Sequence, residues 1–151
     1  MTRRAPLDIL HDGVEILAEL LRPAGFTFVL GSVDRGSGGA FAQGSFVRTG
    51  RVLSFSVREK LGLVQYAYHG RLVSHETLMH VAAPVGAASY PGYSDDPLQA
   101  FRDVSADLRA YGAAFVTGSD TACVAALDAA AANRPPSGFA ALEFARNRRA
   151  V

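Results

Sequence analysis

Residues 40–73 of this chain read AFAQGSFVRTGRVLSFSVREKLGLVQYAYHGRLV. Apolar residues alternate with small or polar ones over short runs, and turn-forming pairs separate the runs. Thr49-Gly50 and His69-Gly70 each place a glycine second in the turn, where tight hairpins require a positive φ. Glu59-Lys60 lies between two more such runs. The pattern predicts four consecutive antiparallel strands, and Phe26–Val33 is predicted as a further strand before them.

The turn at Thr49-Gly50 sets the register of the two central strands, with Arg48 opposite Arg51. At Glu59-Lys60 we expect a two-residue turn that pairs Arg58 with Leu61 and Phe55 with Val64. A three-residue turn there would reverse the faces of the next strand and bury Gln65 in place of β-favouring residues. Because side chains alternate faces, the predicted core face contains Phe26, Phe28, Leu30, Ala42, Gly44, Phe46, Leu53, Phe55, Val57, Val64, Tyr66 and Tyr68.

The flanking segments have helical signals. Residues 6–24 carry leucines and a valine at helical spacing, and Gly25 is a natural C-terminal cap. Ser74 caps a predicted short helix to about Ala83, Asp96-Pro97 opens a long one that ends at Gly118, and Ser119 or Asp120 caps a last one to about Ala132.

These elements predict an α+β fold. It is an antiparallel β-meander of about five strands, with an N-terminal helix and C-terminal helices packed on one face. The predicted single domain covers residues 1–133. Residues 134–151 are predicted as a break followed by a basic tail, because Pro135-Pro136 interrupts the pattern and three arginines follow.

Composition narrows the class of protein. A chain of 151 residues with 49% hydrophobic and 19% charged residues fits one soluble domain. A net charge of +1 gives no general attraction for nucleic acid or an anionic membrane, and no apolar run approaches the roughly 20 residues that span a bilayer. The single cysteine, Cys123, excludes an internal disulfide and fits a reducing compartment, so we expect a cytoplasmic protein.

No segment has a catalytic or metal-binding signature. His75 and His80 lie five residues apart, whereas two zinc ligands on one helical face would lie four apart. The glycine-rich residues 34–39 join two strands and contain no lysine, so they are interpreted as a connector and not as a phosphate loop. We therefore expect no metal and no cofactor, and the sequence favours a non-enzymatic role over an enzymatic one.

Two surfaces are candidates for binding. The first is the outer face of the sheet, opposite the predicted core face, where a mixture of polar and aliphatic side chains is typical of a transient protein interface. Its candidate residues are Gln43, Ser54, Ser56, Arg58 and Gln65. The second is the segment Tyr90-Pro-Gly-Tyr-Ser-Asp-Asp-Pro97, either a helix-entry structure or a recognition loop for a basic partner or polar ligand. Its candidate residues are Tyr90, Tyr93, Asp95 and Asp96.

The segment Leu21-Arg-Pro-Ala-Gly-Phe26 ends the first helix ahead of the meander. Over roughly Leu7–Val73 this order resembles small uncharacterised bacterial proteins, including immunity-type proteins that neutralise toxins of neighbouring cells. The leading hypothesis is therefore a non-enzymatic protein-binding domain, immunity-like in function. The alternative is a small-molecule-binding or enzymatic domain with a pocket at one end of the sheet. Its lining residues would be Tyr66, Tyr68, Arg48 or Arg51.

Self-association is a further hypothesis. The strand Phe26–Val33 contains no proline and no internal charge. If this strand lies at an edge of the sheet, it could pair with its counterpart in a two-fold homodimer. Otherwise a helix or the basic tail would cover it.

Overall fold

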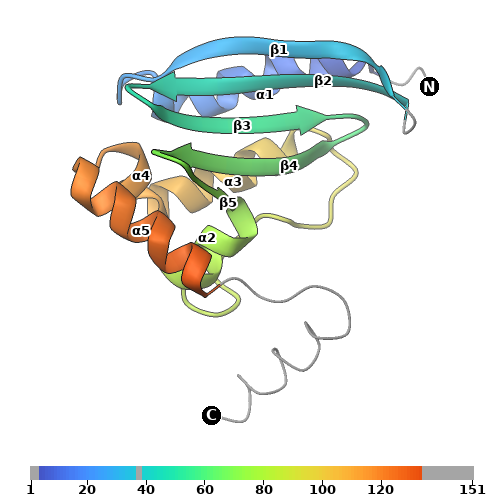
Figure 1. Ribbon diagram of the computed structural model, residues 1–151. Coiled ribbons are helices and arrows are strands. Elements are labelled where there is room, and N and C mark those ends of the chain that lie inside the picture. Colours follow the sequence, from blue (N-terminus) through green and yellow to red (C-terminus); the bar gives the residue numbers. More distant parts are fainter. Residues whose placement is uncertain (1–3, 37–38, 134–151) are drawn as a thin grey trace.

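The structure, a computed structural model, describes residues 4–36 and 39–133. These residues form a five-stranded antiparallel sheet in the order β1-β2-β3-β4-β5, with the helices packed against one face (Figure 1). The predicted α+β class and meander are thus confirmed, whereas the predicted tail, 134–151, lies outside the described residues. The strands are β1 (Thr27–Gly36), β2 (Gly39–Arg48), β3 (Arg51–Val57), β4 (Leu61–Tyr68) and β5 (Arg71–Ser74). The helices are α1 (Pro6–Leu21), α2 (His75–Ala82), α3 (Gln99–Tyr111), α4 (Ala113–Val116) and α5 (Asp120–Ala132).

The β2–β3 and β4–β5 hairpins turn as the sequence predicts. Thr49 and Gly50 have φ angles of 41° and 81°, and His69 and Gly70 have 47° and 76°. Two successive residues of positive φ match the twist of the flanking strands. The β2–β3 register is accordingly the predicted one, from Arg48 opposite Arg51 to Gly44 opposite Phe55.

The β3–β4 hairpin differs from the prediction at its tip. Val57, not Arg58, is the residue opposite Leu61, and the turn contains three residues. The faces of β4 are nevertheless not reversed, because β4 carries an extra residue beside Ser56, and Phe55 still lies opposite Val64. A β-bulge adds one residue to one strand and so shifts the register locally. Val64 and Tyr66 therefore point into the core, and Gln65 faces outward.

The β1 strand corrects two further predictions. It extends to Gly36 and β2 begins at Gly39, so most of the glycine-rich connector forms the ends of two paired strands. Leu30 was predicted in the core but is 47% exposed. It lies opposite Gly44 at the outermost strand, directly before a register shift. Because α1 packs mainly against β2, it leaves Leu30 on β1 uncovered.

The core lies between the sheet and the helices. Buried residues of α1, among them Leu10, Val14 and Leu17, face β2 and β3. Helix α3 packs closely on α1, because Gly13 leaves room for the Phe101 ring. A Cβ atom at Gly13 would lie 2.4 Å from Cζ of Phe101. The C-terminal helix α5 covers β4 and β5, in agreement with the predicted packing of C-terminal helices on the sheet.

The predicted long helix from Asp96 to Gly118 is shorter and interrupted. Asp96 accepts a hydrogen bond from the Leu98 amide and so caps the turn ahead of α3. Helix α3 ends at Tyr111, and the separate turn α4 follows Gly112. This break directs Phe115 back into the core, where its ring lies 4.9 Å from the Tyr66 ring.

Candidate functional site

The outer face of the sheet places its candidate residues in rows that cross the strands. Ser45 on β2 lies opposite Ser54 on β3, which in turn lies opposite Gln65 on β4. Gln43 and Ser56 pair in the next row. The row on the other side of Ser45, Ser54 and Gln65 is mostly aliphatic. Its members are Thr27, Val47, Val52, Ala67 and Leu72. The outer face therefore has a polar centre beside an aliphatic strip.

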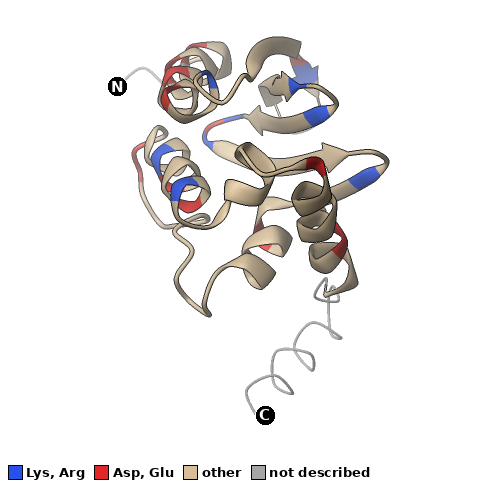
Figure 2. Cartoon of the chain, turned by 90° about the vertical axis from the view of Figure 1, so that its left-hand side faces the viewer, with Lys and Arg blue, Asp and Glu red and all other residues tan. Residues whose placement is uncertain are grey.

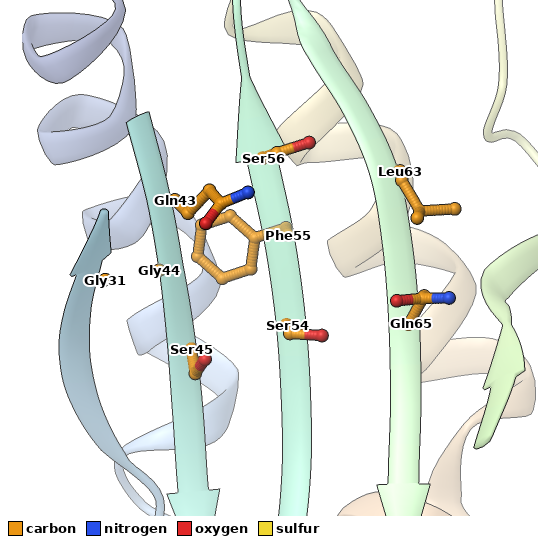
Figure 3. A pocket seen from close by; sticks show the side chains of 9 residues that line it. All are labelled: Gly31, Gln43, Gly44, Ser45, Ser54, Phe55, Ser56, Leu63 and Gln65. Carbon is orange, nitrogen blue, oxygen red and sulfur yellow. The ribbon is translucent and has the colours of Figure 1, made fainter. Parts of the chain in front are cut away.

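A shallow concavity of about 240 Å³ lies over the polar centre (Figure 3). The side chains of Gln43, Ser54 and Gln65 extend over it from three neighbouring strands, and Leu63 stands at its β4 side. Gly31 and Gly44 contribute no side chain at its β1 side, which leaves the hollow open. Leu63 is 56% exposed and Val29, on β1, is 51% exposed. Apolar side chains thus flank the polar centre.

The five polar side chains of this centre are Gln43, Ser45, Ser54, Ser56 and Gln65. Within residues 4–36 and 39–133, none of these five side chains makes a hydrogen bond to another protein group. Each carboxamide carries two donors and an acceptor, and each hydroxyl carries a donor and two acceptor lone pairs. These groups are available to a partner.

Charged side chains stand away from the polar centre. Figure 2 shows that the charged residues lie on the helices and towards the ends and turns of the strands. Arg58, the charged candidate, lies at one end of the outer face with its guanidinium 5.4 Å from the Phe41 ring centre. Its Nη1 donates to the Gly39 carbonyl. Arg58 is therefore already engaged in joining the β3–β4 turn to the start of β2.

The Tyr90–Asp96 segment is partly structural and partly exposed. The Tyr90 hydroxyl donates to the carbonyls of Leu61 and Gly62, at the β4 bulge. Asp96 accepts a hydrogen bond from the Arg102 guanidinium. The hydrogen bonds from the Leu98 amide and from Arg102 lower the pKa of the Asp96 carboxyl from its ordinary value. Only Tyr93 and Asp95 among the four candidates are exposed without such a contact in the described part of the chain. These two residues could meet a partner.

The residues proposed for an end pocket instead hold the core together. Arg51 is 2% exposed, and its guanidinium donates to the Phe115 and Gly118 carbonyls and to Asp120. Those carbonyls belong to the end of α4 and the turn after it, where helical partners are missing. Arg48 donates to the Ala24 carbonyl. Tyr66 is fully buried. None of these residues lines the outer-face concavity.

Sequence reasoning missed a buried polar network. The Tyr66 hydroxyl lies 2.6 Å from Nδ1 of His75, and Nε2 of His75 lies 2.9 Å from Oδ2 of Asp107. All three residues are at most 1% exposed. Asp107 lies on α3 directly before the buried Leu108, and no local motif in the sequence links it to His75 or Tyr66. Burial raises the pKa of Tyr66, and Asp107 and Tyr90 raise it further.

Comparison with protein families, curated proteins and solved structures gives no match to this chain. Within the described residues, no group of three or more His, Cys, Asp or Glu side chains could hold a metal ion. No helix in residues 4–36 and 39–133 has the length and apolar character needed to cross a membrane. The functional argument therefore depends on the geometry of the outer face.

Proposed function

We propose that this protein is a non-enzymatic binding domain whose outer face binds the surface of another protein. The observation that carries the proposal is the uncharged polar centre, with open donors and acceptors, beside an aliphatic strip. On a sheet face that meets only water, the half-exposed apolar side chains of Val29 and Leu63 around the polar centre would have no role. Interfaces of transient complexes combine apolar contact with about one hydrogen bond per 100–200 Å².

The same geometry indicates the chemistry of the partner. A charged group brought over Ser54 would lose water and meet no opposite charge there, which is costly. Peptide groups and uncharged side chains can instead pair with the carboxamides of Gln43 and Gln65. We therefore propose a partner that presents an uncharged, hydrogen-bonding segment flanked by aliphatic side chains.

The resemblance carried by Leu21–Phe26 to immunity-type proteins favours a protein toxin as that partner and a bacterial source. The single thiol, Cys123, is buried and free, which is compatible with the cytoplasmic location that we propose. Tyr93 and Asp95, both exposed on the segment between α2 and α3, are proposed as a secondary contact.

The partner can be sought by affinity capture from the native cell with three baits. Wild type and the variant Ala106→Arg, on the exposed side of α3, should retain the same partner in stoichiometric amount. Ser54→Arg should reduce its capture at least about tenfold, because it places an unpaired charge at the centre of the interface. If circular dichroism shows that Ser54→Arg is unfolded, Gln43→Arg, at a more exposed position, replaces it in the experiment. Equal capture by wild type and the outer-face variants would contradict the proposal.

Salt separates this proposal from nucleic-acid binding. Capture through an uncharged surface should persist at about 0.5 M salt, where screening acts over only a few ångströms. Binding to nucleic acid would weaken steeply over that range because counterions are released from phosphates. A bound species that is nucleic acid, or that is lost with salt, would reject an uncharged protein interface.

A second copy of this chain is the alternative partner, and the oligomeric state in solution tests this alternative. The edge of β1 carries the exposed residues Val29, Leu30 and Val33. A register shift interrupts the strand between Leu30 and Val33, and irregularities of this kind hinder edge-to-edge pairing. We expect sedimentation at micromolar concentration to give a 15.9 kDa monomer. A stable dimer would instead assign β1 to self-association.

A further inference from the structure

His75 occupies a buried position with a defined hydrogen-bonding arrangement. It is the first residue of α2, after the capping residue Ser74. A phenol can donate to Nδ1, whereas a carboxylate only accepts. The contacts to Tyr66 and Asp107 are therefore both satisfied by a neutral imidazole that carries its proton on Nε2.

Asp107 extends this network to the segment that joins α2 to α3. Its Oδ1 accepts the Ser89 amide at 2.6 Å, and its Oδ2 accepts the Tyr90 amide at 2.9 Å. The Tyr90 ring lies 5.6 Å from the imidazole, centre to centre, and covers it edge to face. No residue within 83–98 is buried. The segment is thus held over His75 by a few hydrogen bonds and by three partly buried apolar residues, Ala88, Tyr90 and Leu98. Segments without fully buried residues are typical of regions that open locally.

A second proton on His75 would disturb this arrangement. Nδ1–H would then point at the Tyr66 hydroxyl, which would have to turn its own proton away, and the described residues offer this hydroxyl no other hydrogen-bond partner. The titratable groups that face the imidazole are Tyr66 from β4, Tyr90 from the segment, Asp107 from α3 and Glu76 from α2. Burial lowers the pKa of His75 from its ordinary value of 6.5, although Asp107 and Glu76 act in the opposite direction.

We propose that protonation of His75 releases the segment 83–98, so that this network is a pH-sensitive latch. Opening the segment removes the Tyr90 ring and admits water to the imidazole, which can then carry a charge. The opened form therefore binds a proton more strongly than the closed form, and acid shifts the population toward it. Opening also withdraws the Tyr90 hydroxyl from Gly62, next to Leu63 of the concavity. Any effect of this withdrawal on binding at the concavity rests on the proposed function, whereas the latch itself does not.

The direction of the pH dependence follows from the lowered pKa. The closed form is fully favoured above the ordinary histidine value of 6.5. Between that value and the lower pKa of the closed form, the closed form holds fewer protons than the opened form, so its stability decreases as the pH falls. One proton changes the equilibrium by at most about tenfold per pH unit.

Hydrogen exchange on the full chain measures the latch directly. The protection factors of the Ser89 and Tyr90 amides should fall about tenfold between about pH 7.5 and about pH 5, while amides paired between β2 and β3 keep theirs. His75→Gln should abolish this fall, because a carboxamide can accept from Tyr66 and donate to Asp107 but does not titrate in this range. His11→Gln, on the exposed side of α1, is the matched control and should behave as wild type.

Three results would overturn the latch. The first is unchanged protection of Ser89 and Tyr90 in wild type at the lower pH. The second is an equal loss of protection in the paired strands, which would mean global unfolding. The third is a fall of the same size in His75→Gln. If His75→Gln does not fold, the comparison between the segment and the strands in wild type still decides the question.

Discussion

Replacing Phe55 with alanine should lower the free energy of unfolding by about 3–5 kcal/mol, the usual cost of removing a buried phenylalanine side chain. Phe55 is 4% exposed and belongs to a cluster of four rings. Its ring meets the edge of Phe101 at 6.0 Å and lies 6.2 Å from Phe46 and 6.5 Å from Phe28. The substitution would therefore leave a cavity where β2, β3 and α3 meet.

Chemical denaturation of wild type and variant measures this difference. Val52→Ala, on the outer face of the same strand, is the matched control and should cost about 1 kcal/mol or less, because that side chain is only half-buried. A loss below about 1 kcal/mol for Phe55→Ala would be incompatible with the register that places Phe55 in the core.

Replacing Asp107 with alanine should lower the free energy of unfolding by about 1–3 kcal/mol, because it leaves the buried Nε2–H of His75 without an acceptor. The Asp107 carboxylate accepts from the Ser89 and Tyr90 amides and from Nε2 of His75. All three donors would lose their acceptor, and the imidazole is buried away from water. Unsatisfied buried donors are costly because desolvation is not compensated.

The matched control is Asp103→Ala, one turn earlier on α3. Asp103 is half-buried and accepts from the side chain of Gln99 within the same helix. Pairs of this kind contribute about 0.2–0.5 kcal/mol, so the control should be close to wild type. Equal unfolding midpoints for Asp107→Ala and wild type would show that the network does not stabilise the fold.

Local chemistry made much of this fold predictable. Two-residue turns ending in glycine define a register over only a few residues, so Thr49-Gly50 and His69-Gly70 predicted two hairpins correctly. Ser74 and Ser119 cap their helices as expected, each accepting an amide three residues ahead. Once the register is known, alternation assigns each side chain to a face. The outer-face positions of Gln43, Ser54, Ser56 and Gln65 were therefore accessible from the sequence, although their role in binding stays a prediction.

Contacts between distant segments were not accessible in the same way. The missing side chain of Gly13 makes room for Phe101, a contact that the helical pattern of residues 6–24 did not indicate. Leu30 has the pattern of a core residue, and its exposure follows from where α1 packs on the sheet. The partners of His75 lie 9 and 32 positions away, on β4 and α3. No local pattern encodes such meetings, because they depend on how helices and sheet settle to bury apolar surface and pair every buried polar group.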